Sequence, residues 1–227
     1  MANVCHPTNL CLIPCHIPMS QPAPASITVN DIQYTLADLE HDSWHQLVSA
    51  PQQKASGFKT MTVATNTPSG ADARTVVLRQ VDEVRRYVWF HTDARADKVM
   101  QLKAFPNATL LFWDDKRQIQ LRLTAETKLH TDDHVADEQW KNLWVGSRKM
   151  YLSERVPGSE QPEPYPGFPA HLGEELPTEA GSEAGRRNFA VIECRVLSLE
   201  YLHLGRAGQT RALFQYEPER KTTWLAP

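Results

Sequence analysis

The chain has 227 residues, 41% of them hydrophobic, which is enough apolar material for the core of one sizeable domain. Its formal net charge of -3 argues against nucleic acid or an anionic membrane as the main partner. No apolar run approaches the roughly 18 residues of a membrane-spanning helix. Three of the four cysteines lie in the first 15 residues and the fourth is Cys194, so we expect no disulfide framework and a reducing, cytoplasmic location.

The first thirty residues carry several prolines and show no periodic apolar pattern. We therefore expect residues 1–30 to form a disordered tail, followed by a single domain over residues 31–227. The tail contains three cysteines and two histidines that could bind zinc, namely Cys5, His6, Cys11, Cys15 and His16. Their spacing matches no familiar zinc site, so a tail without metal is the preferred interpretation.

The domain begins with a predicted helix over residues 35–50. Thr35 and Asp38 have the spacing of a reciprocal N-terminal cap, an apolar stripe follows at helical spacing, and Pro51 lies just beyond the end. The Thr-rich run 58–67 then alternates like a strand. The turn residues at 67–70 connect it to a second strand that contains Arg74.

The most informative stretch covers residues 73–106. Arg74 to Arg79 and Val88 to Thr92 each alternate between apolar and polar side chains, with Asp82-Glu83 as the turn between two strands. We expect Thr92-Asp93 to cap a helix that extends to Phe105. Arg95 and Lys98 would then lie on its first turn. A helix N-terminus with a hydroxyl group and two cations is suited to binding phosphate.

The remaining pattern predicts an antiparallel arrangement. Strands are expected at residues 108–113, 117–130, 188–204 (long enough to bend or bulge), 210–217 and 221–225, and helices at 131–144 and 147–153. Residues 156–187 lack periodicity and contain several prolines and glycines, so we expect a surface loop or lid. The predicted fold is mainly β with flanking helices, most economically a closed or split barrel.

The order of these segments resembles the pyridoxamine 5'-phosphate oxidase family, the FMN-binding split barrels. The resemblance covers residues 55–155 well and 188–227 more loosely. It rests on RTVVLR at 74–79, VWFHTD at 88–93, Lys98, Pro106-Asn107, LLFW at 110–113, RQIQL at 117–121 and the C-terminal WLAP. The chain is most similar to a divergent branch in which a helix is followed by Ser-Arg and Tyr-Leu pairs, here at 147–148 and 151–152.

This resemblance implies a homodimer with FMN at the subunit interface and no obligatory protein nucleophile, because the flavin carries out the redox chemistry. Carried over by position, Lys98 would contact the FMN phosphate and Gln118 the ring, and Arg148 would bind substrate. The full set of predicted cofactor-binding residues is Arg74, Val76, Val77, Leu78, Arg79, His91, Thr92, Arg95, Lys98 and Gln118.

Two departures from the family pattern affect this prediction. Ala96-Asp97-Lys98 stands where family oxidases have Ser-Arg-Lys, so a hydroxyl and a cation are lost and an anion is gained. The family's Arg-Leu-His-Asp-Arg segment near the C-terminus is replaced by TRALF at residues 210–214. Flavin binding is therefore better supported than pyridoxamine phosphate as the substrate.

The individual residues also have simpler interpretations. Arg74 and Arg79 lie five residues apart, so on a regular strand they face opposite sides and could be surface cations. Gln118 could begin a solvated strand face, and Arg148 could be a solvated cation. His91 could be a strand histidine with a satisfied hydrogen bond.

Three functions are compatible with these residues. The leading one is an FMN-dependent oxidoreductase that removes hydride from C4' of pyridoxamine or pyridoxine phosphate, with oxygen as the final acceptor. The second keeps FMN but reduces another small molecule with electrons from a nicotinamide. The third is a flavin-binding protein without turnover, or a barrel without flavin that serves as a dimeric interaction module.

Overall fold

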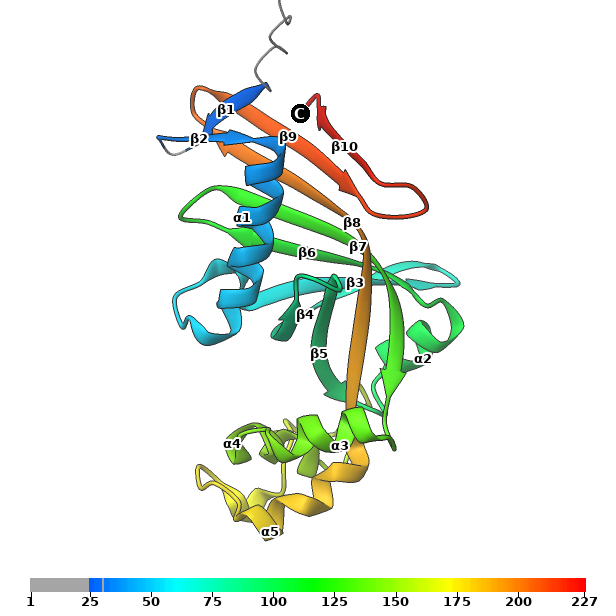
Figure 1. The fold of residues 1–227 in the computed structure, drawn as a ribbon. Helices are drawn as coiled ribbons and strands as arrows, with labels where there is room; N and C mark the ends of the chain where they lie inside the picture. Colours follow the sequence, from blue (N-terminus) through cyan, green and yellow to red (C-terminus); the bar gives the residue numbers. More distant parts are fainter. Residues whose placement is uncertain (1–24, 30) are drawn as a thin grey trace, which may run out of the picture.

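The computed structural model describes residues 25–29 and 31–227 (Figure 1). Its strands are β1 (Ser26–Val29), β2 (Ile32–Thr35), β3 (Thr60–Thr67), β4 (Gly70–Asp82), β5 (Tyr87–Asp93), β6 (Asn107–Asp114), β7 (Ile119–His130), β8 (Phe189–Gly205), β9 (Gly208–Gln215) and β10 (Lys221–Leu225). Its α-helices are α1 (Leu36–Ser49), α2 (Asp97–Ala104), α3 (His134–Lys141), α4 (Val145–Arg148) and α5 (Glu179–Ser182). Short 3₁₀ helices include η3 (Lys149–Leu152), η4 (Ala170–Leu172) and η5 (Glu183–Asn188).

Eight strands form one antiparallel sheet in the order β10-β9-β8-β5-β4-β3-β6-β7. An additional pairing of β8 with β7 closes β3 to β8 into a ring, which confirms the predicted antiparallel split barrel. The 17-residue β8 pairs with β5 up to Arg195 and with β9 from Ser198 onward. We expected this long strand to bend or bulge, and its pairing with β7 is irregular, with Thr124 opposite Ser198 and Ala125 opposite Val196.

The barrel interior is filled by the alternate residues of the strands, as period-2 patterning requires. Phe90, Phe112, Leu121 and Phe214 are among its fully buried side chains. Helix α1 packs its apolar face on the same core, and its Trp44 indole N–H donates to the Tyr216 hydroxyl at 2.8 Å. The predicted capping box at Thr35 and Asp38 is present.

A second, smaller core joins the barrel to a helical lobe, which we define as residues 134–188. Trp140 and Tyr151 of the lobe pack on Phe189 at the start of β8, with ring centroids 5.2 and 5.1 Å from the Phe189 ring. Figure 1 shows α3, α4 and α5 gathered at the end of the barrel where β5 stops and β8 begins. The predicted loop or lid, residues 156–187, belongs to this lobe and contains η4 and α5.

Three local predictions are wrong. The helix expected from Thr92 begins at Asp97, because Thr92 and Asp93 still pair with Ala190 and Phe189 of β8. The helix expected from residue 131 begins at His134, with Asp133 as its cap. The end of the predicted disordered tail contains β1, which forms a hairpin with β2.

The rest of the tail, with its cysteines and histidines, lies outside the described residues. Among the helices of residues 25–29 and 31–227, none has the length and apolar character needed to span a membrane.

The closed core gives a direct stability prediction. Phe90 is 0% exposed at the centre of β5, so Phe90→Ala should lower the free energy of unfolding by about 3–5 kcal/mol. Val84, 85% exposed on the turn between β4 and β5, is the matched control, and Val84→Ala should change it by less than about 0.5 kcal/mol. Urea unfolding followed by tryptophan fluorescence measures both, and equal effects would contradict the assigned register.

Candidate functional site

Two of the predicted cations, Arg74 and Lys98, meet at one end of the barrel beneath α2. Lys98 Nζ donates to Thr92 Oγ1 at 3.1 Å, and Thr92 is buried at the end of β5. Burial, followed by the nearby Arg74 guanidinium, lowers the pKa of Lys98. The two cations therefore repel each other in a partly dry setting, and an anion between them would relieve this repulsion.

Arg74 is held in place by residues of three elements. Its Nη1 donates to Thr65 Oγ1 of β3 at 2.5 Å, and its Nη2 donates to Gln101 Oε1 of α2 at 3.0 Å. The Gln101 amide group in turn donates to Asp72 Oδ2 at 3.0 Å, and Asp72 also pairs with Arg74. Neither Thr65 nor Gln101 is among the residues predicted from the sequence. The spacing of three residues from Lys98 places Gln101 on the same face of α2, which is a signal that could have identified it.

The strand that carries Arg74 has an open edge beside these cations. Residues 70–77 of β4 pair with β3 on one side, whereas pairing with β5 begins only at Leu78. Backbone N–H and C=O groups on that edge are consequently free of strand partners within the described chain. They can hydrogen-bond a ligand, as edge strands do.

Three predicted contact residues lie on this strand. Leu78 is buried in the core, Val76 packs against that core, and Val77 is 36% exposed on the outer face. The Leu78 side chain is thus unavailable to a ligand. The open edge is backbone, so any ligand contact in this stretch would be made mainly by the main chain.

Arg79 does not join Arg74. The register between β4 and β5 shifts at Leu78/Gln80, and Arg79 is the extra residue of this irregularity. Its charge acts on His91 and Tyr151, on the side of the sheet that faces the helical lobe. The buried Arg79 Nε has no hydrogen-bond partner in the described part of the chain.

His91 lies on the outer face of β5, opposite Thr92. Its Nε2 is 2.5 Å from Gln139 Oε1 of α3, and its ring packs edge-on against Phe189 at 4.8 Å. Burial is the main cause that lowers the pKa of His91 to about 4, and the Arg79 charge adds to it. His91 is therefore neutral at pH 7 and joins the barrel to the lobe through Nε2, whereas its buried Nδ1 has no hydrogen-bond partner in the described part of the chain.

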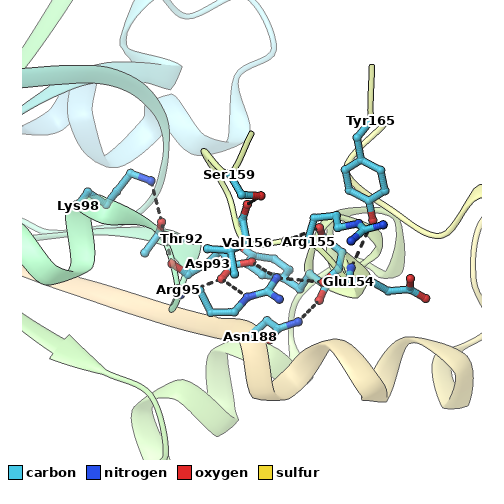
Figure 2. A network of polar contacts seen from close by, with 12 residues as sticks. Thr92, Asp93, Arg95, Lys98, Glu154, Arg155, Val156, Ser159, Tyr165 and Asn188 are labelled. Atoms are coloured by element: carbon cyan, nitrogen blue, oxygen red, sulfur yellow. Dashed lines mark hydrogen bonds and ion pairs between the residues drawn. The ribbon is translucent and has the colours of Figure 1, made fainter. Parts of the chain in front are cut away.

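Arg95 also lies apart from Lys98. Figure 2 shows its guanidinium paired with Asp93, on the other side of the strand end from the Lys98–Thr92 contact. Arg95 Nη2 donates to the Ser153 carbonyl oxygen at 3.0 Å, so the pair fastens the end of β5 to residues 153–155. The exposed Asp97 lies beside Gly158, where a Cβ atom would come 3.7 Å from Asp97 Oδ2.

Gln118 is separated from the other predicted residues within one chain. It occupies the turn between β6 and β7 with a φ of 55°, and its amide donates to the Asp115 carbonyl oxygen at 2.7 Å. Thr65, which contacts Arg74, pairs with Ala108 at the opposite end of β6. A cavity of about 790 Å³ adjoins Gln118, with Lys116, His203 and Arg206 in its walls.

Arg148 has a structural environment in the helical lobe. Its Nε donates to the Leu143 carbonyl oxygen at 3.0 Å, its Nη2 to that of Lys141 at 3.0 Å, and its Nη1 to Glu183 at 2.8 Å. The guanidinium also lies over the Trp140 ring, 5.0 Å from its centroid. With most of its N–H groups already bonded, Arg148 has little left to offer a substrate.

A second cavity of about 500 Å³ lies beside the end of β5. Its walls include Asp93, Tyr151 and residues between 153 and 167. Through Asp93 it adjoins the end of β5, next to Thr92, whose hydroxyl accepts from Lys98 of α2.

The environment of His91 predicts a pH dependence of stability. The unfolded histidine titrates near pH 6.5 and the folded one near 4, so His91 stabilises the fold fully above pH 6.5 and loses this contribution, at most about 3 kcal/mol, as pH falls to 4. His91→Gln keeps a polar partner for Gln139 but cannot titrate. Its unfolding free energy should fall less than that of the wild type between pH 7 and 4, and parallel curves would contradict this assignment.

Comparison with known proteins identifies the family. Residues 50–167, more than half of the chain, match the family model described as pyridoxamine 5'-phosphate oxidase. A pyridoxine/pyridoxamine 5'-phosphate oxidase of Gloeothece citriformis is 35% identical over 103 residues, which are 42% of this chain and 47% of that protein. One from Kineococcus radiotolerans is 29% identical over 68% of this chain and 79% of its own length. The chain thus aligns with only about half the length of the first relative.

The fold agrees with this assignment. A pyridoxamine 5'-phosphate oxidase-related, FMN-binding protein of Nostoc punctiforme superposes with a TM-score of 0.61 at 20% identity, covering 82% of this chain and 96% of that protein. At this identity the similarity shows a shared fold. Together with the matched family model, these observations show that the chain belongs to the pyridoxamine 5'-phosphate oxidase family.

Proposed function

We propose that this protein is an FMN-dependent oxidoreductase and that Arg74, Thr92 and Lys98 bind the FMN phosphate. The observation that carries the proposal is the half-buried Lys98, which donates to the Thr92 hydroxyl and forms no ion pair with the described residues. A phosphate dianion is bound best by cations together with a hydroxyl group. Arg74, Thr92 and Lys98, which we call the cradle, offer both. The open edge of β4 lies beside the cradle. Its backbone N–H and C=O groups can hydrogen-bond the rest of the cofactor.

The residues present fit the cofactor in two further respects. Asp97, the anion gained relative to the family pattern, is exposed and lies toward Gly158. Arg74 is fixed by Thr65 and Gln101 before any ligand binds, so little side-chain entropy is lost on binding. Arg79 and His91 face the lobe, on the other side of the sheet, and would not contact the phosphate.

FMN, when bound, accepts a hydride from a substrate carbon and passes electrons on to an acceptor. The chain's own contribution would be positional. Arg74 and Lys98 would anchor the cofactor at its phosphate, and the helical lobe would limit access of water to the end of β5. His91, neutral at pH 7 and bonded to Gln139, would carry no proton in the reaction.

The names of the two curated relatives favour pyridoxine or pyridoxamine 5'-phosphate as the substrate and oxygen as the acceptor. One observation favours retaining a second candidate, an FMN-dependent reductase that takes its electrons from a nicotinamide cofactor. Arg148, the residue expected to hold the substrate phosphate, is bonded within the lobe. Peroxide release on addition of pyridoxamine 5'-phosphate would support the oxidase, whereas flavin bleaching by NADPH under argon would support the reductase.

The site would be completed by a second copy of the chain. Gln118 and Arg74 lie at opposite ends of β6 and its neighbours, so one FMN could reach both only across a subunit interface. The outer face formed by β3, residues 70–77 of β4 and β6 is suited to such an interface because it carries no charged residue. It presents Thr60, Thr62, Ala64, Ala73, Thr75, Val77, Thr109, Leu111 and Trp113.

The affinity of variants for FMN tests whether Arg74 and Lys98 bind its phosphate. Lys98→Ala and Arg74→Ala should each weaken FMN binding by about ten-fold or more, because each removes a charge-assisted hydrogen bond to phosphate. Lys103, exposed on the last turn of α2, is the control, and Lys103→Ala should leave the affinity unchanged. Quenching of FMN fluorescence measures all three, and full affinity in the double variant Arg74→Ala/Lys98→Ala would refute the assignment.

The uncharged face predicts the oligomeric state. Thr75→Glu places a carboxylate in its centre and should convert the dimer to a monomer, since an unpaired charge cannot be buried without cost. Val84→Glu, on an 85% exposed site, should remain dimeric. Light scattering after size-exclusion chromatography gives the masses, and a wild type that is monomeric with FMN bound would contradict the interface.

A further inference from the structure

The helical lobe contains a cavity of its own, of about 500 Å³, which we call the lobe cavity. Its walls come from Leu152, Glu154 and residues between 169 and 188. It shares no lining residue with the cavity that contains Asp93 and Tyr151. The lobe cavity is therefore separate from the proposed FMN contacts and from the cavity beside the end of β5. Its volume is typical of a site for a small molecule.

Part of the lobe cavity is apolar. Its walls include the side chains of Leu152, Leu172 and Leu176, together with Pro169 and Pro177. Leu176 is 54% exposed, so an apolar group in the cavity would remove part of its surface from water. The cavity thus offers a place for the apolar body of a ligand.

The polar part of the lobe cavity carries charges of both signs. Glu154, Glu175 and Arg187 all line it and are exposed, and His171 is the remaining titratable group in its walls. Within residues 25–29 and 31–227, none of the three charged residues forms an ion pair, because the ion pairs of the lobe join other residues. A ligand that carries both an anionic and a cationic group could pair with both signs at once.

A buried amide group in the same wall also lacks a partner. Asn188 is 6% exposed, and its Nδ2 donates to the Tyr151 carbonyl oxygen at 2.8 Å. Its Oδ1 accepts no hydrogen bond from the described part of the chain, although buried amide oxygens normally have a donor. Asn188 Oδ1 is therefore an acceptor that an ammonium group in the cavity could use.

The wall is held in place before a ligand arrives. Lys149 is 7% exposed, and its Nζ donates to the carbonyl oxygens of Gly173 and Glu175 at 2.5 and 2.9 Å. Further along, Thr178 Oγ1 accepts from the Gly181 backbone N–H at 3.0 Å and caps α5. Because these contacts already order the segment, little conformational entropy is lost when the cavity is filled.

We propose that the lobe cavity binds a small zwitterion with an apolar body, namely a free amino acid with an apolar side chain. Arg187 binds its carboxylate. Glu154 and Glu175 attract its ammonium group, for which Asn188 Oδ1 is a hydrogen-bond acceptor. Asn188 also bonds the backbone of Tyr151, which lines the cavity beside the end of β5, so the ligand stabilises that wall as well.

The test is a calorimetric titration of the full chain with L-phenylalanine and with three probes that each lack one of its groups. Hydrocinnamate lacks the ammonium group, phenethylamine lacks the carboxylate, and glycine lacks the apolar body. The wild type should bind L-phenylalanine about ten-fold or more tightly than each of the three, because each loses one set of contacts.

Variants assign the two charges. Arg187→Ala should weaken L-phenylalanine and hydrocinnamate by about ten-fold without weakening phenethylamine. The double variant Glu154→Gln/Glu175→Gln should weaken L-phenylalanine and phenethylamine without weakening hydrocinnamate. Arg85→Ala and Glu83→Gln, at exposed residues on the turn between β4 and β5, are the matched controls and should bind like the wild type.

Two results would overturn the proposal. One is no saturable binding of L-phenylalanine to the wild type at millimolar concentration. The other is an equal loss of hydrocinnamate and phenethylamine in each variant, because a purely structural effect does not distinguish the two charges. Thermal unfolding shows that each variant is folded. The titration does not depend on the FMN content, so its failure would leave the proposed function untouched.

Discussion

The pairing of β8 with three other strands determines where β5 ends, and with it the positions of Thr92 and Asp93. Its first half pairs with β5 and β7, and its second half with β7 and β9. This closes the ring and holds β5 in register to its last residue, Asp93, opposite Phe189. Because the strand continues to that point, Thr92 and Asp93 face opposite sides of the sheet. The end of β5 therefore separates the Lys98–Thr92 contact from the cavity lined by Asp93 and Tyr151.

The two sides differ in electrostatic character. Inside the barrel end, the Lys98 and Arg74 side chains lie next to hydroxyl and amide groups, which is the environment of an anion site. On the side of the helical lobe, the aromatic packing of Trp140, Tyr151 and Phe189 favours neutral groups, and burial lowers the pKa of His91 accordingly. The fold thus places two cations at the proposed cofactor phosphate and keeps His91 neutral at the joint between barrel and lobe.

Much of the fold could be predicted because it is encoded locally. Strand alternation and the cap at Thr35 depend on neighbouring residues, and both agree with the structure. The start of α2 was predicted wrongly because the pairing of Thr92 with Ala190 is a contact between distant parts of the chain. Likewise, Arg95 contacts Ser153 and Arg148 contacts Glu183, both in the lobe and far along the chain, so no local pattern indicates these contacts.

The central claim is that the chain binds FMN in the cradle of Arg74, Thr92 and Lys98. The most direct measurement is the absorption spectrum of the protein purified from cells supplied with riboflavin, followed by mass spectrometry of what heat releases. We predict a flavin spectrum and FMN at close to one per chain. A colourless protein whose melting temperature is unchanged by excess FMN would contradict the claim and leave only the shared fold.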